Sequence, residues 1–243
     1  MSNTQLENVL IIGGSHGITF EITRQLLSAG INVTAMSRTP GQLEELPAEQ
    51  KDHLTHVVFD VIKDEIPNDA IPSSLDGFVF GPGSINLGGV RNVKSDRLMA
   101  DLELNVVAAV RCFQAAMPAL RAESTGSAVF FSTVAVNHGV AMHSYIAAAK
   151  GALQALAKTW AAELAPAVRV NCVAPALTET PLSKNLLSTD EKRSAMAEKY
   201  PLGRVGQPTD IAAAAIYLLS PQSNWVTGQV LPVDGGMSSV IRL

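Results

Sequence analysis

The chain has 243 residues, of which 47% are hydrophobic and 16% are charged, and its net charge is −4. A single domain of this size buries about 70–75% of its unfolded surface, so it needs neither disulfides nor a structural metal. The charge gives no electrostatic reason to expect a nucleic acid or an anionic membrane as a partner.

The two cysteines, Cys112 and Cys172, form no Cys-x-x-Cys pair. We expect both to be buried thiols of a protein kept in a reducing compartment. No basic segment followed by an apolar stretch opens the chain, and no apolar run is long enough to span a bilayer. These features predict a cytoplasmic protein without a signal peptide.

Short apolar runs alternate with helical patterns along the whole chain. The runs predict β-strands at residues 9–12, 32–36, 57–60, 77–80, 128–132, 169–173 and 230–233. Apolar residues at helical spacing predict helices at 18–27, 98–121, 144–164 and 209–219. Continuous apolar strands joined by helices imply parallel crossovers. The sequence therefore predicts an α/β fold of the Rossmann type, with a doubly wound, mostly parallel seven-stranded sheet in three α/β/α layers.

No repeat, low-complexity tract or linker divides the chain, so we predict one domain over residues 1–243. The most irregular stretch, 176–204, lies between the sixth strand and the last long helix. Loops after the carboxyl ends of strands tend to cover the binding site. We expect this stretch to shape the substrate pocket, and we see no cluster of metal-ligating side chains in it.

A glycine-rich turn follows the first strand and opens the first helix. Its residues include Gly13, Ser15, His16, Gly17 and Ile18. Glycines let the backbone turn tightly and approach a pyrophosphate, and a helix N-terminus offers free N–H groups and the positive end of a dipole. The turn predicts a dinucleotide site, and a plain strand-to-helix turn is the alternative.

The end of the second strand indicates which dinucleotide is bound. An acid at this place binds the adenine ribose, whereas an arginine accommodates the 2′-phosphate of NADP. The chain has Ser37 and Arg38 there, and His16 supplies a second donor nearby. We predict NADP(H) rather than NAD, although Arg38 as a solvated surface charge is the simpler alternative.

These motifs make the chain similar to the short-chain dehydrogenase/reductase family over nearly its whole length. Gly13 and Gly17 fit the family's Gly-x-x-x-Gly-x-Gly turn, with Thr19 in place of the third glycine. Residues 169–175, 203–208, 227–229 and 233–236 resemble its later signatures. The resemblance implies an oxidoreductase that acts on CH–OH or carbonyl groups of a small molecule.

The resemblance also implies roles for single residues. Asn105 matches a residue that supports the active site, and Asp60 and Val61 match the pair that holds the adenine. Gly81, Pro82 and Gly83 line the turn after the fourth strand. Pro175, Thr178 and Thr180 lie where the nicotinamide amide is held. In the turn after the fourth strand the family's Asn-Asn-Ala-Gly reads Phe-Gly-Pro-Gly, so both asparagine side chains are absent. Ala176 likewise replaces a glycine.

The family's catalytic centre uses a tyrosine, a lysine one helical turn later and a serine. The tyrosine transfers the proton, the lysine stabilises its phenolate and binds the nicotinamide ribose, and the serine bonds the same substrate oxygen. Lys150, followed by Gly-Ala-Leu, resembles the family lysine. Four residues earlier lies Ile146, whereas Tyr145 lies five residues earlier, about 140° away around a helix.

Two alignments of this centre compete. The ungapped one gives Thr133, Ile146 and Lys150, which lacks the proton donor. The shifted one gives Ser132, Tyr145 and Lys150, but it needs an extra residue in the helix, such as a π-bulge. It also requires Ser132 to face the other side of its strand. We favour the ungapped alignment, in which the tyrosine-assisted step is lost.

A histidine is the alternative proton donor in the ungapped alignment. His143 precedes Ile146 by three residues and His138 lies in the same loop. The sequence thus predicts an NADP(H)-binding oxidoreductase with an altered active site, or alternatively a non-catalytic NADP(H)-binding sensor or partner subunit. The resemblance further implies a homotetramer or homodimer in which helices 98–121 and 144–164 pair across an interface, unless those helix faces pack within the subunit.

Overall fold

The computed structural model describes residues 6–122 and 126–241. They form a seven-stranded sheet in the order β3-β2-β1-β4-β5-β6-β7, parallel at every pairing. The strands are β1 (Asn8–Ile12), β2 (Asn32–Ser37), β3 (Leu54–Val58), β4 (Gly77–Phe80), β5 (Gly126–Phe131), β6 (Val168–Pro175) and β7 (Val230–Val233). The predicted Rossmann-type sheet is confirmed, and it is parallel throughout rather than mostly parallel.

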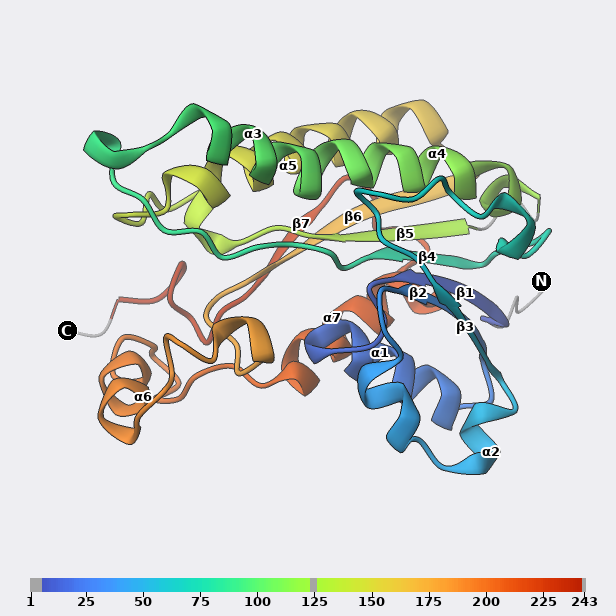
Figure 1. Cartoon of the computed structure of the whole chain (residues 1–243), viewed down its shortest axis with the longest axis horizontal. Helices are drawn as coiled ribbons and strands as arrows, with labels where there is room; N and C mark the ends of the chain where they lie inside the picture. The colour runs from blue at the N-terminus through green and yellow to red at the C-terminus, as the bar shows by residue number, and fades with distance from the viewer. Residues whose placement is uncertain (1–5, 123–125, 242–243) are drawn as a thin grey trace.

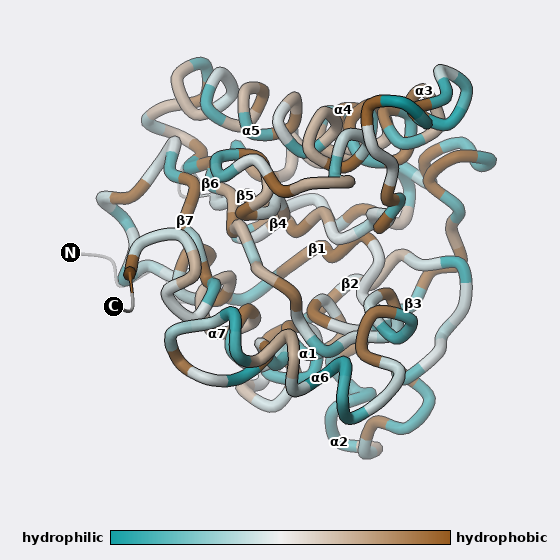
Figure 2. The backbone as a smooth tube through the Cα atoms, turned by 90° about the vertical axis from the view of Figure 1, so that its left-hand side faces the viewer, coloured by the Kyte–Doolittle hydropathy of each residue, from teal (hydrophilic) through white to brown (hydrophobic). Residues whose placement is uncertain are grey.

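Helices cover both faces of this sheet (Figure 1). One layer contains α3 (Ser95–Leu102), α4 (Ala108–Arg121) and α5 (Ser144–Leu164). The other contains α1 (Gly17–Ser28) and α7 (Pro208–Leu219), with α2 (Ala48–Lys51) and α6 (Asp190–Ala197) towards its edges. In Figure 2 the central strands are mostly hydrophobic, whereas α2 and α6 are largely hydrophilic. None of the helices in the two described segments has the length and apolarity that a membrane crossing requires.

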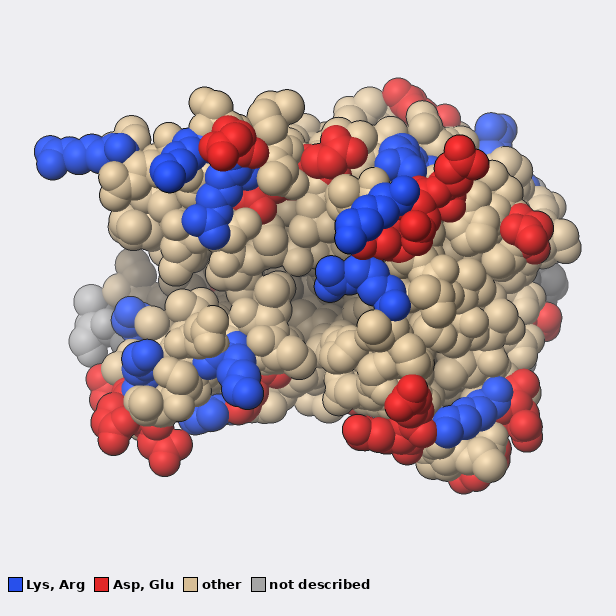
Figure 3. Space-filling view, in the orientation of Figure 1, with Lys and Arg blue, Asp and Glu red and all other residues tan. Residues whose placement is uncertain are grey.

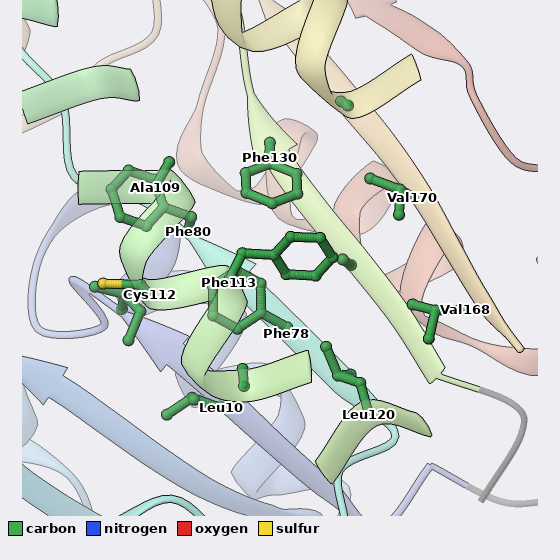
Figure 4. Packing of buried hydrophobic residues seen from close by; sticks show 14 of the residues in the cluster. Leu10, Phe78, Phe80, Ala109, Cys112, Phe113, Leu120, Phe130, Val168 and Val170 are labelled. Atoms are coloured by element: carbon green, nitrogen blue, oxygen red, sulfur yellow. The ribbon is translucent and has the colours of Figure 1, made fainter. Parts of the chain in front are cut away.

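Alternation along each strand gives the sheet a separate core on each face. Leu10 and Ile12 contact one cluster, and Val9 and Ile11 contact the other, because successive side chains of a strand point to opposite faces. Under α4 and α5 the first cluster holds a group of aromatic rings, partly seen in Figure 4: Phe78, Phe113, Phe130 and Trp160, with neighbouring ring centroids 5.0–5.8 Å apart. These two cores hold the carboxyl ends of the strands in fixed positions.

Both cysteines lie in the first of these clusters, free and buried. Burial raises the pKa of Cys112 and of Cys172 to about 12, so both thiols stay protonated and unreactive at neutral pH. The expectation of buried thiols is confirmed.

The third strand begins earlier than predicted, at Leu54 rather than at residue 57. β3 is the edge strand of the sheet and pairs only with β2, so its side chains are half-buried and alternate with polar ones. The apolar run by which the sequence predicts this strand therefore covers only the end of β3, at Val57 and Val58. Asp60, predicted as strand, lies beyond it in a turn.

The predicted helix at 98–121 is longer and is interrupted. It starts with α3 at Ser95, passes through a π-helical turn, η4 (Glu103–Val107), and continues as α4. The sequence placed a possible π-bulge in the helix at 144–164, but α5 is α-helical from Ser144 to Leu164. The irregular turn thus surrounds Asn105 rather than Tyr145, and no extra residue brings Tyr145 onto the face of Lys150.

The order in which strands are added to the sheet reverses between β1 and β4, because β2 and β3 extend the sheet on one side of β1 and β4 to β7 on the other. In open parallel sheets ligands bind at the carboxyl ends of the strands beside such a switch point. Hydrogen bonds join the carboxyl ends of the three strands at this point. Gly13 N, after β1, donates to Met36 O of β2 at 2.7 Å, and Gly81 N, after β4, donates to Ile12 O of β1 at 2.9 Å. The candidate site must therefore form around these two glycines.

Candidate cofactor and active site

A cavity of about 610 Å³ lies at the carboxyl ends of the strands, within the range of small-molecule sites. In Figure 3 the surface is hollowed between the helices above and below the sheet. Its walls come from the glycine turn, the segment after β4, the end of β5, the start of α5 and the segment after β6. Among residues 6–122 and 126–241, no aspartate or glutamate lines it, and its basic side chains are His16, His143, Lys150 and Lys199.

The glycine turn has the backbone geometry that a pyrophosphate site needs. Gly13 has φ 83° and Gly17 has φ 61°, a region that glycine adopts without steric cost. Gly17 is the first residue of α1 and lines the cavity, so the N-terminal N–H groups of the helix face it. Gln42 Oε1 accepts a hydrogen bond from Gly17 N at 3.3 Å, a contact that the sequence did not suggest.

Two departures from the family pattern compensate each other in this turn. Thr19 Oγ1 donates to Gly13 O at 2.6 Å, which fixes its rotamer and directs its methyl group towards the end of β4. A Cβ atom at position 81 would clash with that methyl group and lie 3.1 Å from Ile12 O. Gly81 therefore makes room for Thr19, so the lost asparagine and the lost third glycine form one matched change.

Two basic side chains lie at the end of β2. Arg38 and His16 are exposed, and neither takes part in an ion pair within the described segments. His16 Nδ1 lies 2.9 Å from Ser15 Oγ, and its ring packs against Gly41. No described salt bridge competes with an anion for these two side chains.

Ser37 is buried beneath this basic end and has two polar partners. Its Oγ donates to Thr39 O at 2.9 Å and lies 2.9 Å from His56 Nε2 on β3. Burial lowers the pKa of His56, which favours the neutral ring. Sequence reasoning missed His56, because only the pairing of β2 with β3 brings it beside Ser37.

Asp60 and Val61 follow β3 outside the residues that line the cavity. Asp60 Oδ1 accepts from Ile62 N at 2.9 Å, and Val61 is buried in the core beneath α4. Neither residue lines the cavity, so their predicted contact with the adenine stays a prediction.

Residues at and beyond the end of β6 form the opposite wall. Pro175, Thr178 and Thr180 all line the cavity, and their contacts with a cofactor stay a prediction. Thr178 Oγ1 donates to Ala176 O at 3.0 Å, and Thr180 caps the short helix η6 (Pro181–Ser183). Glu179 pairs with Arg193 of α6 and accepts from Gln207 Nε2 at 3.0 Å, which fastens the 176–204 segment over the cavity.

Lys150 lies in the cavity wall, 7% exposed, with no hydrogen-bond acceptor for its Nζ among the described residues. Burial lowers its pKa from 10.5 to about 8. A Cβ atom at Gly83 would lie 3.3 Å from Lys150 Nζ and 3.2 Å from Asn105 Oδ1, so this glycine keeps a narrow space open between them. Asn105 Oδ1 is itself buried without a partner, which leaves an acceptor beside the lysine.

The π-helical turn explains how Asn105 is held. Its Nδ2 donates to the backbone oxygen of Asp101 at 2.8 Å and to Ser84 Oγ at 3.3 Å. Ser84, a cavity residue, donates to Asp101 Oδ1 at 2.6 Å, and Asn86 Nδ2 donates to the same oxygen at 2.7 Å. Sequence reasoning missed Ser84 and Asp101, because the contact joins the β4 loop to α3.

Ile146, Ser132 and Thr133 all line the cavity. Thr133 Oγ1 accepts from Ala135 N at 3.3 Å, so its own proton is available to a ligand. Ser132 Oγ instead accepts from Gln154 Nε2 at 2.7 Å and lies 3.5 Å from the backbone oxygen of Lys150. The expectation that Ser132 and Thr133 face opposite sides is wrong, because both lie beyond the end of β5 at Phe131 and both line the cavity.

Tyr145 does not line the cavity. Its hydroxyl accepts from Lys94 N at 2.7 Å and donates to Asn92 O at 3.2 Å, and its ring packs on Gly88. The shifted alignment is therefore wrong about this side chain: a five-residue step in a regular helix directs it towards the 88–94 loop.

The geometry agrees with what comparison with known proteins shows. A family model described as enoyl-(acyl carrier protein) reductase matches residues 13–238. The chain belongs to the short-chain dehydrogenase/reductase family. A tropinone reductase homologue of Arabidopsis thaliana is 30% identical over 242 residues, covering 95% of this chain and 92% of its own. The 3-oxoacyl-[acyl-carrier-protein] reductase FabG of Chlamydia muridarum is 31% identical, covering 94% and 96%.

A solved structure described as ElxO with NADP bound superposes with a TM-score of 0.87 at 25% identity, covering 97% of this chain and 100% of its own. As a member of this family the chain is related to NAD(P)-dependent oxidoreductases.

Gly81→Ala should destabilise the fold by about 1–3 kcal/mol, because the new methyl group meets Thr19 Cγ2 and overpacks the switch point. Urea unfolding of the variant measures this loss. In a Thr19→Ser background, which keeps the hydroxyl and removes the methyl group, the same change should cost less. Equal costs in the two backgrounds would contradict the compensation.

Lys150 should give the folded state a distinct dependence on pH. Its folded pKa is about 8 and its ordinary value 10.5, so between these values the unfolded chain binds more protons and stability rises with pH. The rise is at most about 1.4 kcal/mol per pH unit, and below pH 8 it flattens. The difference in unfolding free energy between wild type and Lys150→Met measures it, and a constant difference from pH 7 to pH 10 would show that the lysine is solvated.

Proposed function

We propose that this chain is an NADP(H)-dependent oxidoreductase that acts on a small carbonyl or alcohol substrate. The observation that carries the proposal is the pair of unpaired basic side chains, Arg38 and His16, beside a glycine turn that opens into the cavity. A ribose 2′-phosphate would complete this basic end. The relative whose structure is described with NADP bound supports the choice of dinucleotide.

The residues present fit such a cofactor. Gly13, Ser15, Gly17 and Ile18 would hold the pyrophosphate, and Ser37 would line the adenosine end. At the other end Gly83 leaves a space beside Lys150 and the unpartnered Asn105 Oδ1, where ribose hydroxyls find both a donor and an acceptor. The remaining predicted contacts come from Asp60, Val61, Gly81, Pro82, Pro175, Thr178 and Thr180. When bound, the cofactor supplies or removes a hydride.

Around that chemistry the chain orients the substrate and moves protons. Thr133 can donate a hydrogen bond to the substrate oxygen, because its own acceptor position is already used by Ala135 N. Ile146 occupies the wall one helical turn before Lys150 and carries no titratable group. In this proposal the family's tyrosine-assisted step is absent, and Tyr145 serves to anchor the 88–94 loop.

The substrate half of the cavity is mostly apolar. Its side chains include Ile85, Leu87, Val134, Val140, Leu182, Leu186, Met196 and Met237. The 176–204 segment contributes several of them, which supports its predicted role in shaping the pocket. An uncharged, largely apolar carbonyl compound fits these walls better than a cationic one, since no carboxylate lines them.

Several further expectations remain predictions: one domain over residues 1–243, a cytoplasmic location and a homotetramer or homodimer. The outer face of the α3–α4 helix exposes Met99 (63%) and Val107 (41%), which suits the pairing of these helices between subunits.

Cofactor choice is tested by titrating NADPH and NADH and following nicotinamide fluorescence. NADPH should bind more tightly than NADH. Arg38→Ala should weaken the binding of NADPH by at least about tenfold and change the binding of NADH little. Arg121→Ala, at the far end of α4, is the matched control. Equal loss for both dinucleotides would show that Arg38 does not recognise the 2′-phosphate.

A non-catalytic binding protein is the second candidate, favoured by Ile146 in the cavity wall. A carbonyl panel with NADPH separates the two. If the chain is an enzyme, wild type turns over and Tyr145→Phe keeps its rate, while losing about 1 kcal/mol of stability with its hydrogen bonds to the 92–94 backbone. If only Ile146→Tyr turns over, the natural chain is a binding protein.

A further inference from the structure

We propose that His143 is the acid–base group of this site and transfers a proton between its Nε2 atom and the substrate oxygen. The proposal rests on the proposed function and assigns the step for which Ile146 has no group. His143 lines the cavity and is the residue immediately before α5. No described carboxylate lines the same cavity.

The start of α5 places His143 on the same cavity as the two wall residues of this helix. His143 is the N-cap of α5, with non-helical φ −99° and ψ 20°. It precedes Ile146 by three residues and Lys150 by seven, and all three side chains line the cavity.

A hydrogen bond fixes which nitrogen of His143 is free. Its Nδ1 lies 2.8 Å from the backbone oxygen of Ala141. A carbonyl oxygen only accepts, so Nδ1 carries the proton in the neutral ring and Nε2 remains the basic nitrogen. Holding one tautomer in this way is what a general base requires.

The backbone before His143 is held in an unusual conformation. Met142 has φ 68°, the only positive φ at a non-glycine residue in the described segments. This conformation costs about 1–2 kcal/mol and persists only where neighbours impose it. Here Gly88 N donates to Met142 O at 2.7 Å and Gly88 bridges to His143. The loop after β4 therefore holds the backbone of Met142 and His143 in place.

Other titratable side chains of the cavity are less suited to the step. Tyr200 is buried, its hydroxyl accepts from Leu177 N at 3.3 Å, and burial raises its pKa. Lys150 lies by the narrow space at Gly83, where the ribose would be bound. His16 belongs to the glycine turn, and Lys199 is exposed at the 176–204 segment. His143 is the remaining group beside the apolar substrate walls.

In the direction of reduction the carbonyl carbon receives the hydride that a reduced nicotinamide dinucleotide supplies, and the C=O π bond becomes the electron pair of an alkoxide. That oxygen takes the proton from His143 Nε2 and forms the alcohol O–H bond. The imidazolium becomes neutral imidazole and regains a proton from solvent, which reaches it because His143 is partly exposed.

The test compares His143→Gln and His143→Ala with His138→Ala. His138 is an exposed histidine of the same loop that does not line the cavity, so it is the matched control. Both His143 variants should lose about 10²–10⁴-fold in kcat for a carbonyl substrate while binding NADPH as wild type does. His138→Ala should keep both properties.

A second readout needs no cofactor. Nitrogen-15 NMR of the histidine rings at a pH where they are neutral, with the His143 signal assigned by its loss in His143→Gln, should show the tautomer protonated at Nδ1. A neutral ring protonated at Nε2 instead, or an unchanged kcat in both His143 variants, would overturn the proposal and leave the proposed function standing. Failure of wild type to bind NADPH would overturn the proposed function instead, and NADPH binding without turnover would overturn the assignment of His143.

Discussion

The site depends on the close approach of backbone segments at the switch point of the sheet, between β1 and β4. Gly13 and Gly81 bond to the strand ends beside them, at Met36 O and Ile12 O; Gly13 has a positive φ of 83°, and Gly81 has no room for a side chain. The methyl group of Thr19 fills the space that Gly81 leaves, so two departures from the family pattern preserve one geometry. The first turn of α1 and the segment after β4 are thereby held as two walls of one cavity.

The phase of α5 decides which side chains meet in that cavity. Ile146 and Lys150 share one face, and His143, the N-cap of the helix, lines the same cavity. Tyr145 is rotated away and its phenol is used to hold the backbone at Asn92 and Lys94. Tyr145 thus holds the 88–94 loop in place, while Ile146 and His143 line the cavity.

A buried polar network links this wall to α3. Asp101 accepts from Ser84 and Asn86, and the π-helical turn lets Asn105 bond the backbone oxygen of Asp101. One oxygen of Asp101 and one of Asn105 remain without partners among the described residues. Buried polar groups of this kind are costly unless satisfied, which suits a site completed by a polar ligand next to Lys150.

Sequence alone determined the order of strands and helices, the glycine turn and the angular separation of Tyr145 from Lys150. These are properties of local periodicity, because 3.6 residues per turn and two per pleat operate within a few residues. Tertiary structure alone decided the partners: the contact of Thr19 with Gly81, the bond of Ser84 to Asp101, and the lowered pKa of Lys150. Each of these joins segments that only sheet pairing and layer packing bring together, and burial of a charge depends on all of its surroundings.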